Sequence, residues 1–435
     1  MAVWLPIKPA APVTKTTRAP DGGMVATLVR GRMRFKPLYA CSVLPSLHPM
    51  HAEATCNARD RSDSASATDR RPELLALTSV RFFAALEVVL LHTLYELGGE
   101  EARAIPLPIM RLFTRGELAV SFFFVLSGFI LAYTYCDRTN DLKTTPKTFW
   151  RARFARIYPL YFLGFVMDLP RVSALFLGSV ASLSAAVIKI GVAALAYLLL
   201  VQSWHPRVTN TWNTPGWTLS VEAFFYALFP LLLRLTRNWT LRRLCLVALA
   251  IWALPLILDA IVFRDASSPV ALTFSRSFPP LRLPEFFLGV AAGRVFLTKR
   301  FAPHRTALRI AGALALGLIV AIALTVHLLP VALESTLSAP LFALAIIALA
   351  SDAIPTPRWL NGSGFVLLGR ASYAVYILHQ PFKQLFLMFA AFAGLGSPGP
   401  TQLLCYLVSL QLFCIALFLW FEDPARRLIT RSRAS

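Results

Sequence analysis

Charged residues are scarce in this chain. Asp, Glu, Lys and Arg together make up 15% of its 435 residues, whereas 57% are apolar and the mean hydropathy is +0.61. Soluble domains carry about 25% charged residues. The composition therefore excludes an ordinary soluble enzyme and indicates a polytopic membrane protein.

Acidic residues are the scarcest charged group, with 22 Asp and Glu against 43 Lys and Arg, which gives a net charge of +21. Such an excess would also suit a nucleic-acid-binding protein. The Lys and Arg residues fall mainly between apolar segments, however, where the positive-inside rule accounts for them. We therefore expect membrane lipid around the chain and no nucleic acid as a partner.

The six cysteines show no CxxC spacing, and four of them lie in or at the edge of apolar segments. This pattern favours neither a zinc site nor a disulfide framework, so we expect no metal site. Residues 1–73 contain no sustained apolar stretch with a cleavage site, which argues against a signal peptide. Their proline, arginine, serine and threonine content predicts a disordered, cytoplasmic tail. A start at Met24, Met33 or Met50 is an open alternative.

The rest of the chain reads as a series of apolar segments separated by basic clusters. Clusters of Lys and Arg at 138–156, 234–243, 299–309 and 423–433 place those loops and both termini in the cytoplasm. Parity then requires an odd number of crossings between Arg151 and Trp217. We expect an all-α membrane helical bundle. It has about ten transmembrane helices if either 154–169 or 185–203 is re-entrant or interfacial, or up to twelve if 172–187 also spans. Its membrane domain covers 74–425, and 426–435 form a short basic cytoplasmic tail. The segments are 77–97, 117–136, 154–169, 185–203, 217–233, 244–263, 283–298, 308–329, 333–351, 364–389 and 402–421.

Two basic residues interrupt the first apolar segment. Arg81 and His92 are eleven residues apart, a spacing that returns to the same helix face within roughly 20°. An arginine in a membrane span costs at least about 2.5 kcal/mol on insertion scales, and such residues usually face an interior cavity. We interpret the pair as one site that crosses the bilayer. The structural alternative is that Arg81 extends to the nearby membrane surface and His92 hydrogen-bonds to a neighbouring helix.

A carboxylate enters the segment 217–233 from its outer end. Glu222 follows Trp217 by one and a half helical turns, which predicts a position at the depth of His92. A histidine beside a carboxylate is a plausible general base, because the acid stabilises the imidazolium. Glu222 as an acid that only packs between helices or binds water is the alternative.

Three arginines stand beside aromatic residues at the start of the third apolar segment. Arg151, Arg153 and Arg156 present guanidinium groups, whose fork matches the geometry of phosphate. They could hold an anionic donor such as coenzyme A. Anchoring of the helix to anionic lipid head groups is the alternative reading.

The segment near residue 370 brings hydroxyl groups, an arginine and a histidine into one span. Arg370, Tyr373 and Tyr376 are three residues apart, so they run down adjacent helix faces and are candidates to line one channel. Ser372 and His379 belong to the same stretch. Ordinary hydrogen bonding between helices is the alternative.

Taken together, these elements resemble the acyltransferase-3 family of integral membrane acyltransferases, which modify sugars and other hydroxylated acceptors. The resemblance covers residues from about 74 to 425. The matching pieces, in the family's order, are Arg81-x10-His92, residues 116–129, Arg153-x2-Arg156-Ile157-x-Pro159-x-Tyr161, residues 217–222 with Phe225-Tyr226, and Ser372-Tyr373-x2-Tyr376-x2-His379.

The resemblance implies acyl-CoA as the usual donor and a role in activity for the arginine and histidine of the first span. It implies donor handling for the cytoplasmic arginines. We carry these roles to Arg81, His92, Arg153 and Arg156, and we add Glu222, Ser372, Tyr373 and His379 as further candidates.

The resulting hypothesis is O-acyl transfer, with acetyl expected, from acyl-CoA to a hydroxyl of a carbohydrate or similar acceptor, with no permanently bound cofactor. Arg81 and the 151–156 cluster hold the donor phosphates or polarise the thioester carbonyl. His92 takes the proton of the acceptor hydroxyl, and Glu222 orients it. An acyl-enzyme intermediate on a serine, tyrosine or histidine is an open alternative.

We expect an integral protein of a bacterial inner membrane that takes part in O-acetylation of a cell-envelope polysaccharide or another exported acceptor. Some relatives fuse an esterase-like domain after the last span, whereas this sequence stops at Ser435. If the acceptor lies outside, the protein transfers the acyl group directly or hands it to a separate extracytoplasmic transferase. The rival hypothesis is a proton-coupled transporter or flippase of sugar-type substrates, because intramembrane arginine, histidine and glutamate also mark such pathways.

Overall fold

The computed structural model describes residues 28–29, 32–33, 71–179, 182–262, 268–300, 302–325, 331–394 and 397–431. The chain divides into two compact units, one of Lys8–Pro72 and one that contains Glu73–Ser435. In the first unit, strands β1 (Leu28–Val29) and β2 (Arg32–Met33) pair in antiparallel register. Apart from these strands and residues 71–73, the tail predicted for residues 1–73 lies outside the described residues.

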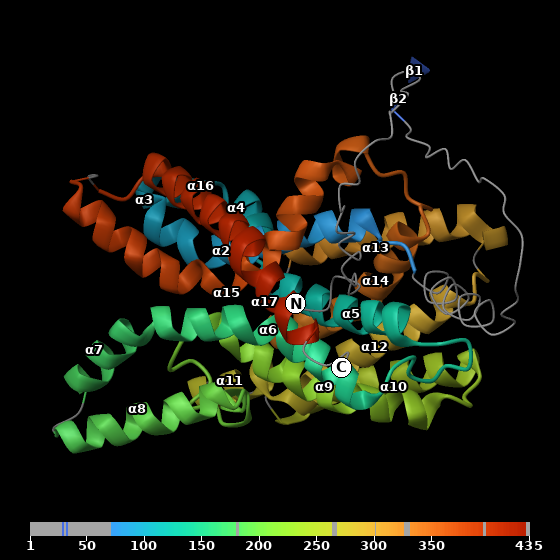
Figure 1. Ribbon diagram of the computed structural model, residues 1–435, viewed down its shortest axis with the longest axis horizontal. Helices are drawn as coiled ribbons and strands as arrows, with labels where there is room; N and C mark the ends of the chain where they lie inside the picture. Colours follow the sequence, from blue (N-terminus) through green and yellow to red (C-terminus); the bar gives the residue numbers. More distant parts are fainter. Residues whose placement is uncertain are drawn as a thin grey trace, which may run out of the picture. The chain divides into compact units, whose positions relative to one another are not determined.

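Helices make up the second unit (Figure 1). The α-helices are α2 (Leu75–Leu97), α3 (Gly99–Arg103), α4 (Leu107–Phe113), α5 (Gly116–Tyr135), α6 (Pro146–Met167), α7 (Leu169–Ser179), α8 (Leu183–Leu198), α9 (Trp217–Thr236), α10 (Leu241–Val262), α11 (Pro269–Ser277), α12 (Pro279–Leu297), α13 (Arg305–Thr325), α14 (Val331–Ala350), α15 (Ser363–Phe392), α16 (Pro400–Leu417) and α17 (Asp423–Arg431). Shorter segments are the 3₁₀ helices η1 (Gln202–Trp204), η2 (Thr214–Gly216), η3 (Ala302–His304) and η4 (Arg358–Asn361), and the π-helical η5 (Phe418–Glu422).

Local sequence signals account for several helix starts. Pro146, Pro279 and Pro400 occupy the first turns of α6, α12 and α16. The backbone N–H groups of a first turn have no partner within the helix, so proline, which lacks this group, costs no hydrogen bond there. At α6 the hydroxyl of Thr145 also accepts a hydrogen bond from the backbone N–H of Thr148, at 3.2 Å. These signals fix where α6 begins and therefore where its arginines lie.

The predicted all-α membrane bundle is confirmed for this unit. Ten of its described helices have 18 residues or more, namely α2, α5, α6, α9, α10, α12, α13, α14, α15 and α16. Length and apolar composition together select six possible spans, or seven if α6 and α7, which are bent by 45° at their junction, form one. The number of crossings therefore stays a prediction, with ten matching the helices of sufficient length.

The segment between α6 and α9 forms two short helices. α7 has 11 residues and α8 has 16, whereas a span needs about 20. α7 and α8 pack against each other, and Figure 1 shows them in green at one edge of the helical unit. The stretch 172–187, proposed as an additional span, is divided between these two helices.

Glycines set the closest helix contacts in the unit. A Cβ atom at Gly289 of α12 would lie 1.9 Å from the carbonyl oxygen of Val125 on α5, so the two backbones touch there. A Cβ atom at Gly369 of α15 would lie 1.9 Å from the carbonyl oxygen of Thr78 on α2. The second contact holds α2 and α15 together, and these two helices carry most of the candidate site.

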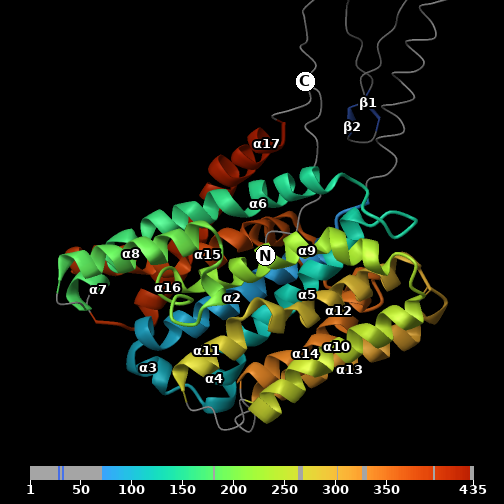
Figure 2. The same cartoon turned by 90° about the horizontal axis from the view of Figure 1, so that it is seen from below.

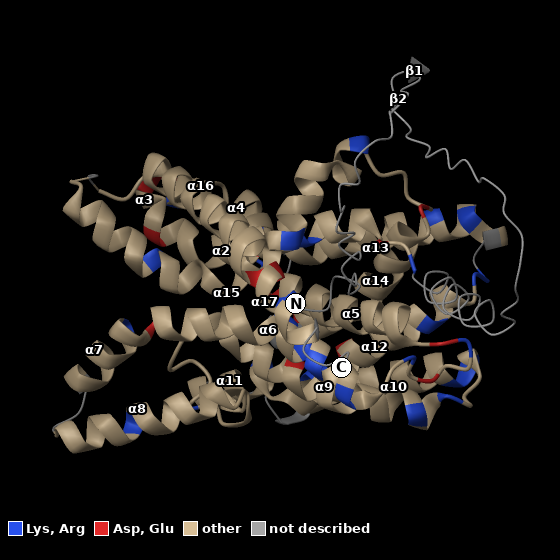
Figure 3. Cartoon of the chain, in the orientation of Figure 1, with Lys and Arg blue, Asp and Glu red and all other residues tan. Residues whose placement is uncertain are grey.

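Apolar side chains face outward over much of the surface. Exposed examples are Ile310 and Leu314 on α13 and Leu404, Val408 and Leu412 on α16. Figure 3 shows that charged residues occupy few positions along the helices. An apolar outer surface suits surrounding lipid, and the family found below makes the chain an integral membrane protein.

The C-terminal segment returns across the bundle. The π-helical η5 joins α16 to α17, and α17 packs against α6, as Figure 2 shows. Single π-helical turns inside α-helices occur often at functional sites. This turn carries Glu422, which contacts an arginine of the candidate site.

Candidate active site

Two groups of polar side chains lie on α2, one toward each end. The helix is continuous from Leu75 to Leu97 and carries both Arg81 and His92. At 1.5 Å per residue their backbone positions are about 16 Å apart along the axis. Both residues approach α15, because His379 of α15 lies beside His92 and Arg370 is an electrostatic neighbour of Arg81. The candidate site therefore has an arginine end and a histidine end.

The arginine end is formed by α2 and α6. Arg81 is completely buried, and Arg153 and Arg156 of α6 are 3% and 2% exposed. Arg156 and Arg81 lie within electrostatic range of each other. Burying like charges together is costly unless an opposite charge compensates. The cluster is thus suited to an anionic group.

Aromatic rings and one carboxylate surround these arginines. Arg153 donates a hydrogen bond to the hydroxyl of Tyr135 at 2.7 Å, and its guanidinium lies over the Tyr135 ring, 5.1 Å from the centroid. Arg156 forms an ion pair with Glu422 and lies over the ring of Tyr373, 5.6 Å from the centroid. Cation–π contacts of this kind stabilise a guanidinium away from water.

Two other predicted arginines lie at the margin of this cluster. Arg151 is partly exposed and donates to the carbonyl of Thr430 on α17, at 3.3 Å. Arg370 pairs with Glu73, with 2.7 Å between Nη2 and Oε2, and its side chain is 33% exposed. The structure therefore brings Arg81, Arg153 and Arg156 into the interior and leaves Arg151 and Arg370 nearer the surface.

His92 is held by its own helix. Its Nδ1 lies 2.8 Å from the carbonyl oxygen of Val88. Because a carbonyl only accepts, this contact assigns the proton to Nδ1 and leaves the lone pair on Nε2. His379 has the same arrangement, with Nδ1 2.7 Å from the carbonyl of Tyr376, and its Nε2 lies 3.4 Å from Nδ1 of His92.

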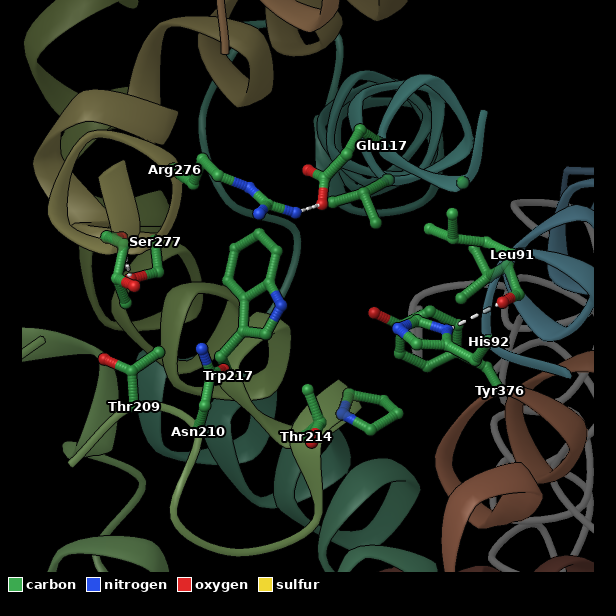
Figure 4. A pocket seen from close by; sticks show the side chains of 15 residues that line it. Leu91, His92, Glu117, Thr209, Asn210, Thr214, Trp217, Arg276, Ser277 and Tyr376 are labelled. Atoms are coloured by element: carbon green, nitrogen blue, oxygen red, sulfur yellow. Dashed lines mark hydrogen bonds and ion pairs between the residues drawn. The ribbon is translucent and has the colours of Figure 1, made fainter. Parts of the chain in front are cut away.

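A cavity of about 200 Å³ opens beside His92 (Figure 4). Pockets for drug-sized ligands measure about 300–1,000 Å³, so this one suits a single small unit of a larger molecule. Figure 4 shows Trp217 between His92 on one side and Thr209 and Asn210 on the other. The lining residues are Val88, Leu91, His92, Gly116, Glu117, Val120, Thr209, Asn210, Thr214, Pro215, Trp217, Thr273, Arg276, Ser277 and Tyr376.

Glu222 contacts Tyr226 of its own helix, and its predicted pairing with His92 stays a prediction. Trp217 lines the pocket with His92, and Glu222 lies five residues further along α9, about 7.5 Å deeper. There its Oε2 accepts a hydrogen bond from the hydroxyl of Tyr226, at 3.0 Å. The group that orients His92 is the Val88 carbonyl.

The hydroxyl groups of α15 have assigned partners. Ser372 donates to the carbonyl of Gly369 in its own helix, at 2.8 Å. Tyr373 donates to the carbonyl of Ile157 on α6, at 2.5 Å, and Thr218 donates to the hydroxyl of Tyr376 at 3.0 Å. Tyr376 is the one of these three that lines the pocket. Tyr373 instead belongs to the arginine end.

Several ion pairs near the site were not predicted from the sequence. Arg276 of α11 pairs with Glu117 of α5 in the pocket wall, and Lys383 pairs with Glu96 at 2.5 Å next to His92. Glu422 is the partner of Arg156. Sequence signals existed, since Glu117 is the only acid of its span and Glu422 stands at the end of the last one. Their partners lie too far along the chain for spacing rules to identify them.

Within the described residues, no group of three or more His, Cys, Asp or Glu side chains is placed to hold a metal ion. What the site offers is a histidine with an available lone pair in a small polar pocket and a set of buried guanidinium groups. Such a set is chemically suited to proton abstraction at one end and anion binding at the other.

Comparison with known proteins identifies the family. Residues 74–419 match the acyltransferase domain of the acyltransferase-3 family. The chain is 32% identical to acyltransferase MdmB of Streptomyces mycarofaciens over 70% of this chain and 78% of that protein. It is also 32% identical to exopolysaccharide production protein ExoZ of Rhizobium meliloti, over 74% of this chain and 92% of that protein. No solved structure matches. The protein belongs to the acyltransferase-3 family and is a membrane enzyme that transfers acyl groups.

Proposed function

We propose that the protein is an O-acyltransferase that moves an acyl group, acetyl in the first instance, from acyl-CoA to a hydroxyl of a carbohydrate or similar acceptor. One observation carries the proposal: the single helix α2 contributes Arg81 to a buried arginine cluster and His92 to a polar pocket. The names of two relatives, an acyltransferase and an exopolysaccharide production protein, agree with acyl transfer to a hydroxylated product.

The arginine end suits the donor. Coenzyme A carries several phosphate groups, and guanidinium forks bind phosphate with two parallel hydrogen bonds. Arg81, Arg153 and Arg156 concentrate three such forks in the buried interior, where Glu422 pairs with Arg156. The positive-inside rule places this end toward the cytoplasm, where acyl-CoA is made. Both termini would then be cytoplasmic and the membrane would be the inner membrane of a bacterium.

The separation of the two ends limits what Arg81 does. The sequence left open whether it holds the donor phosphates or polarises the thioester carbonyl. An acceptor hydroxyl at His92 attacks a carbonyl carbon within reach of that histidine, and Arg81 lies about 16 Å further along α2. We therefore assign Arg81 to the phosphates. The pantetheine arm of the donor would then bridge the distance between the two ends.

The chemical step uses His92 as the general base. Its Nε2 takes the proton of the acceptor hydroxyl while the oxygen attacks the thioester carbonyl. The tetrahedral intermediate collapses by breaking the carbon–sulfur bond, and the proton held by His92 passes to the thiolate. The products are the acyl ester and free coenzyme A. The hydrogen bond from Nδ1 to Val88 keeps Nε2 as the basic nitrogen throughout.

The proposal is tested with the full chain in lipid nanodiscs, isotopically labelled acetyl-CoA and a glycan extract of the producing cells. Thiol release and label in the glycan should rise together, in a one-to-one ratio. Thiol release without label in any acceptor would show hydrolysis only, and no thiol release would overturn acyl-CoA as the donor. In either case the proposal fails.

A further inference from the structure

The pocket beside His92 contains one ion pair in an otherwise uncharged wall. Among its lining residues, all of them described, Glu117 and Arg276 are the only ones with a full charge apart from titratable His92. They pair with each other within one wall of the pocket. Figure 4 shows the pair beside Trp217, on the wall opposite Thr214. The remaining polar side-chain groups are hydroxyls, one amide and the indole N–H of Trp217, so the wall as a whole is neutral.

The two partners come from different parts of the bundle. Glu117 lies in the first turn of α5, which is held against α12 by the backbone contact at Gly289. Arg276 lies near the end of the nine-residue α11. The Glu117 side chain is 16% exposed and that of Arg276 is 43% exposed. Glu117 therefore provides a fixed carboxylate, and Arg276 still presents N–H donors toward the cavity.

This arrangement selects for uncharged acceptors. A guanidinium with no counter-ion binds a carboxylate or phosphate through two parallel hydrogen bonds. Here Glu117 already occupies part of that fork, and its own charge repels a second anion. A sugar hydroxyl, by contrast, donates to Glu117 and accepts from Arg276 without disturbing the pair. The indole of Trp217 adds an apolar face for the carbon skeleton of a sugar ring.

We propose that the Arg276–Glu117 pair determines acceptor specificity, by recognising a neutral hydroxylated unit next to the reacting hydroxyl and excluding acidic ones. The proposal rests on the function proposed above. It makes Arg276 and Glu117 specificity residues that contact the acceptor, and it leaves proton abstraction to His92.

The test compares neutral methyl hexopyranosides with the matching methyl hexuronosides as acceptors, using the full chain, acetyl-CoA and thiol release. The intact protein should prefer the neutral series by at least about tenfold in kcat/KM. Glu117→Gln releases the guanidinium of Arg276, so the preference should shift toward the hexuronosides by about tenfold. The double variant Glu117→Gln/Arg276→Gln should lose this gain. A gain of activity does not arise from misfolding.

Glu334→Gln is the matched control. Glu334 pairs with Arg115 at 3.1 Å and does not line the pocket, so the same chemical change should leave the acceptor preference unaltered. An unchanged preference in Glu117→Gln, or an equal shift in Glu334→Gln, would overturn the specificity role. Absence of thiol release with every acceptor in the intact protein would instead overturn the underlying function.

Discussion

Glu422→Gln is the substitution that probes the arginine end most directly. Glu422 and Arg156 form an ion pair in which the side chains are 1% and 2% exposed. Breaking a buried pair by neutralising one partner costs about 3–5 kcal/mol, because the remaining charge keeps its desolvation penalty. Arg81 and Arg153 add like charge nearby. We therefore expect the variant without ligand to unfold at a clearly lower temperature than the intact protein.

Coenzyme A should reverse much of this loss. If its phosphates bind the arginine cluster, they replace the charge that Glu422 supplied, and the variant should bind coenzyme A more tightly than the intact protein does. A ligand at 100 times its Kd stabilises a protein by about 2.7 kcal/mol. The upward shift of the unfolding temperature on adding a fixed, saturating concentration of coenzyme A should thus be larger in Glu422→Gln than in the intact protein.

A second buried pair provides the control for this experiment. Arg282 and Glu285 of α12 are 2% and 1% exposed and lie 3.1 Å apart, away from the arginine cluster. Glu285→Gln should destabilise the protein to a similar degree without enlarging the effect of coenzyme A. Thermal unfolding in nanodiscs, followed by tryptophan fluorescence, measures all these quantities. Equal coenzyme A shifts in Glu422→Gln, Glu285→Gln and the intact protein would refute the placement of the donor.

Further substitutions test other contacts. Arg156→Lys should raise KM for acetyl-CoA about tenfold with little change in kcat, because lysine lacks the planar fork; a fall confined to kcat would contradict a binding role. Ser372→Ala should keep at least half of the activity, since its hydroxyl bonds to Gly369 in its own helix, and a loss would point to an acyl-enzyme on Ser372. Gly369→Val should lower the free energy of unfolding by about 3 kcal/mol or more, because the new side chain clashes with the carbonyl of Thr78. Gly178 has open space around it, so Gly178→Ala should not destabilise the protein. Thermal unfolding measures both effects.

The helical architecture could be predicted from the sequence because membrane spans have a strong local signal. Apolar runs placed most of the long helices within a few residues of their observed ends, as for α2 and α15, whereas α6 begins eight residues before the predicted start at 154. The spacing of Arg81 and His92 predicted that the two residues share one helix face, and both lie near residues of α15. Such features depend on short stretches of chain and on helical geometry alone.

The partners of the charged side chains could not be predicted. Arg276 and Glu117 are 159 residues apart in sequence, and their meeting depends on how α11 folds over the end of α5. The hydrogen bond from Tyr226 to Glu222, within one helix, was also not predicted, because the sequence analysis assigned Glu222 to His92 by depth alone. Contacts between distant helices follow from tertiary packing, which one sequence does not display.

In the proposed mechanism, His92 takes the proton of the acceptor hydroxyl as the acyl group is transferred to it. This role of His92 is tested most directly by mass spectrometry of envelope and extracellular glycans from producing cells that carry either the intact protein or His92→Ala, with equal membrane insertion of both confirmed. General-base catalysis contributes about 10²–10⁴-fold, so we predict an acyl mass increment in the glycans with the intact protein and less than 1% of it with His92→Ala. Equal acylation with both proteins would show that His92 is not the base.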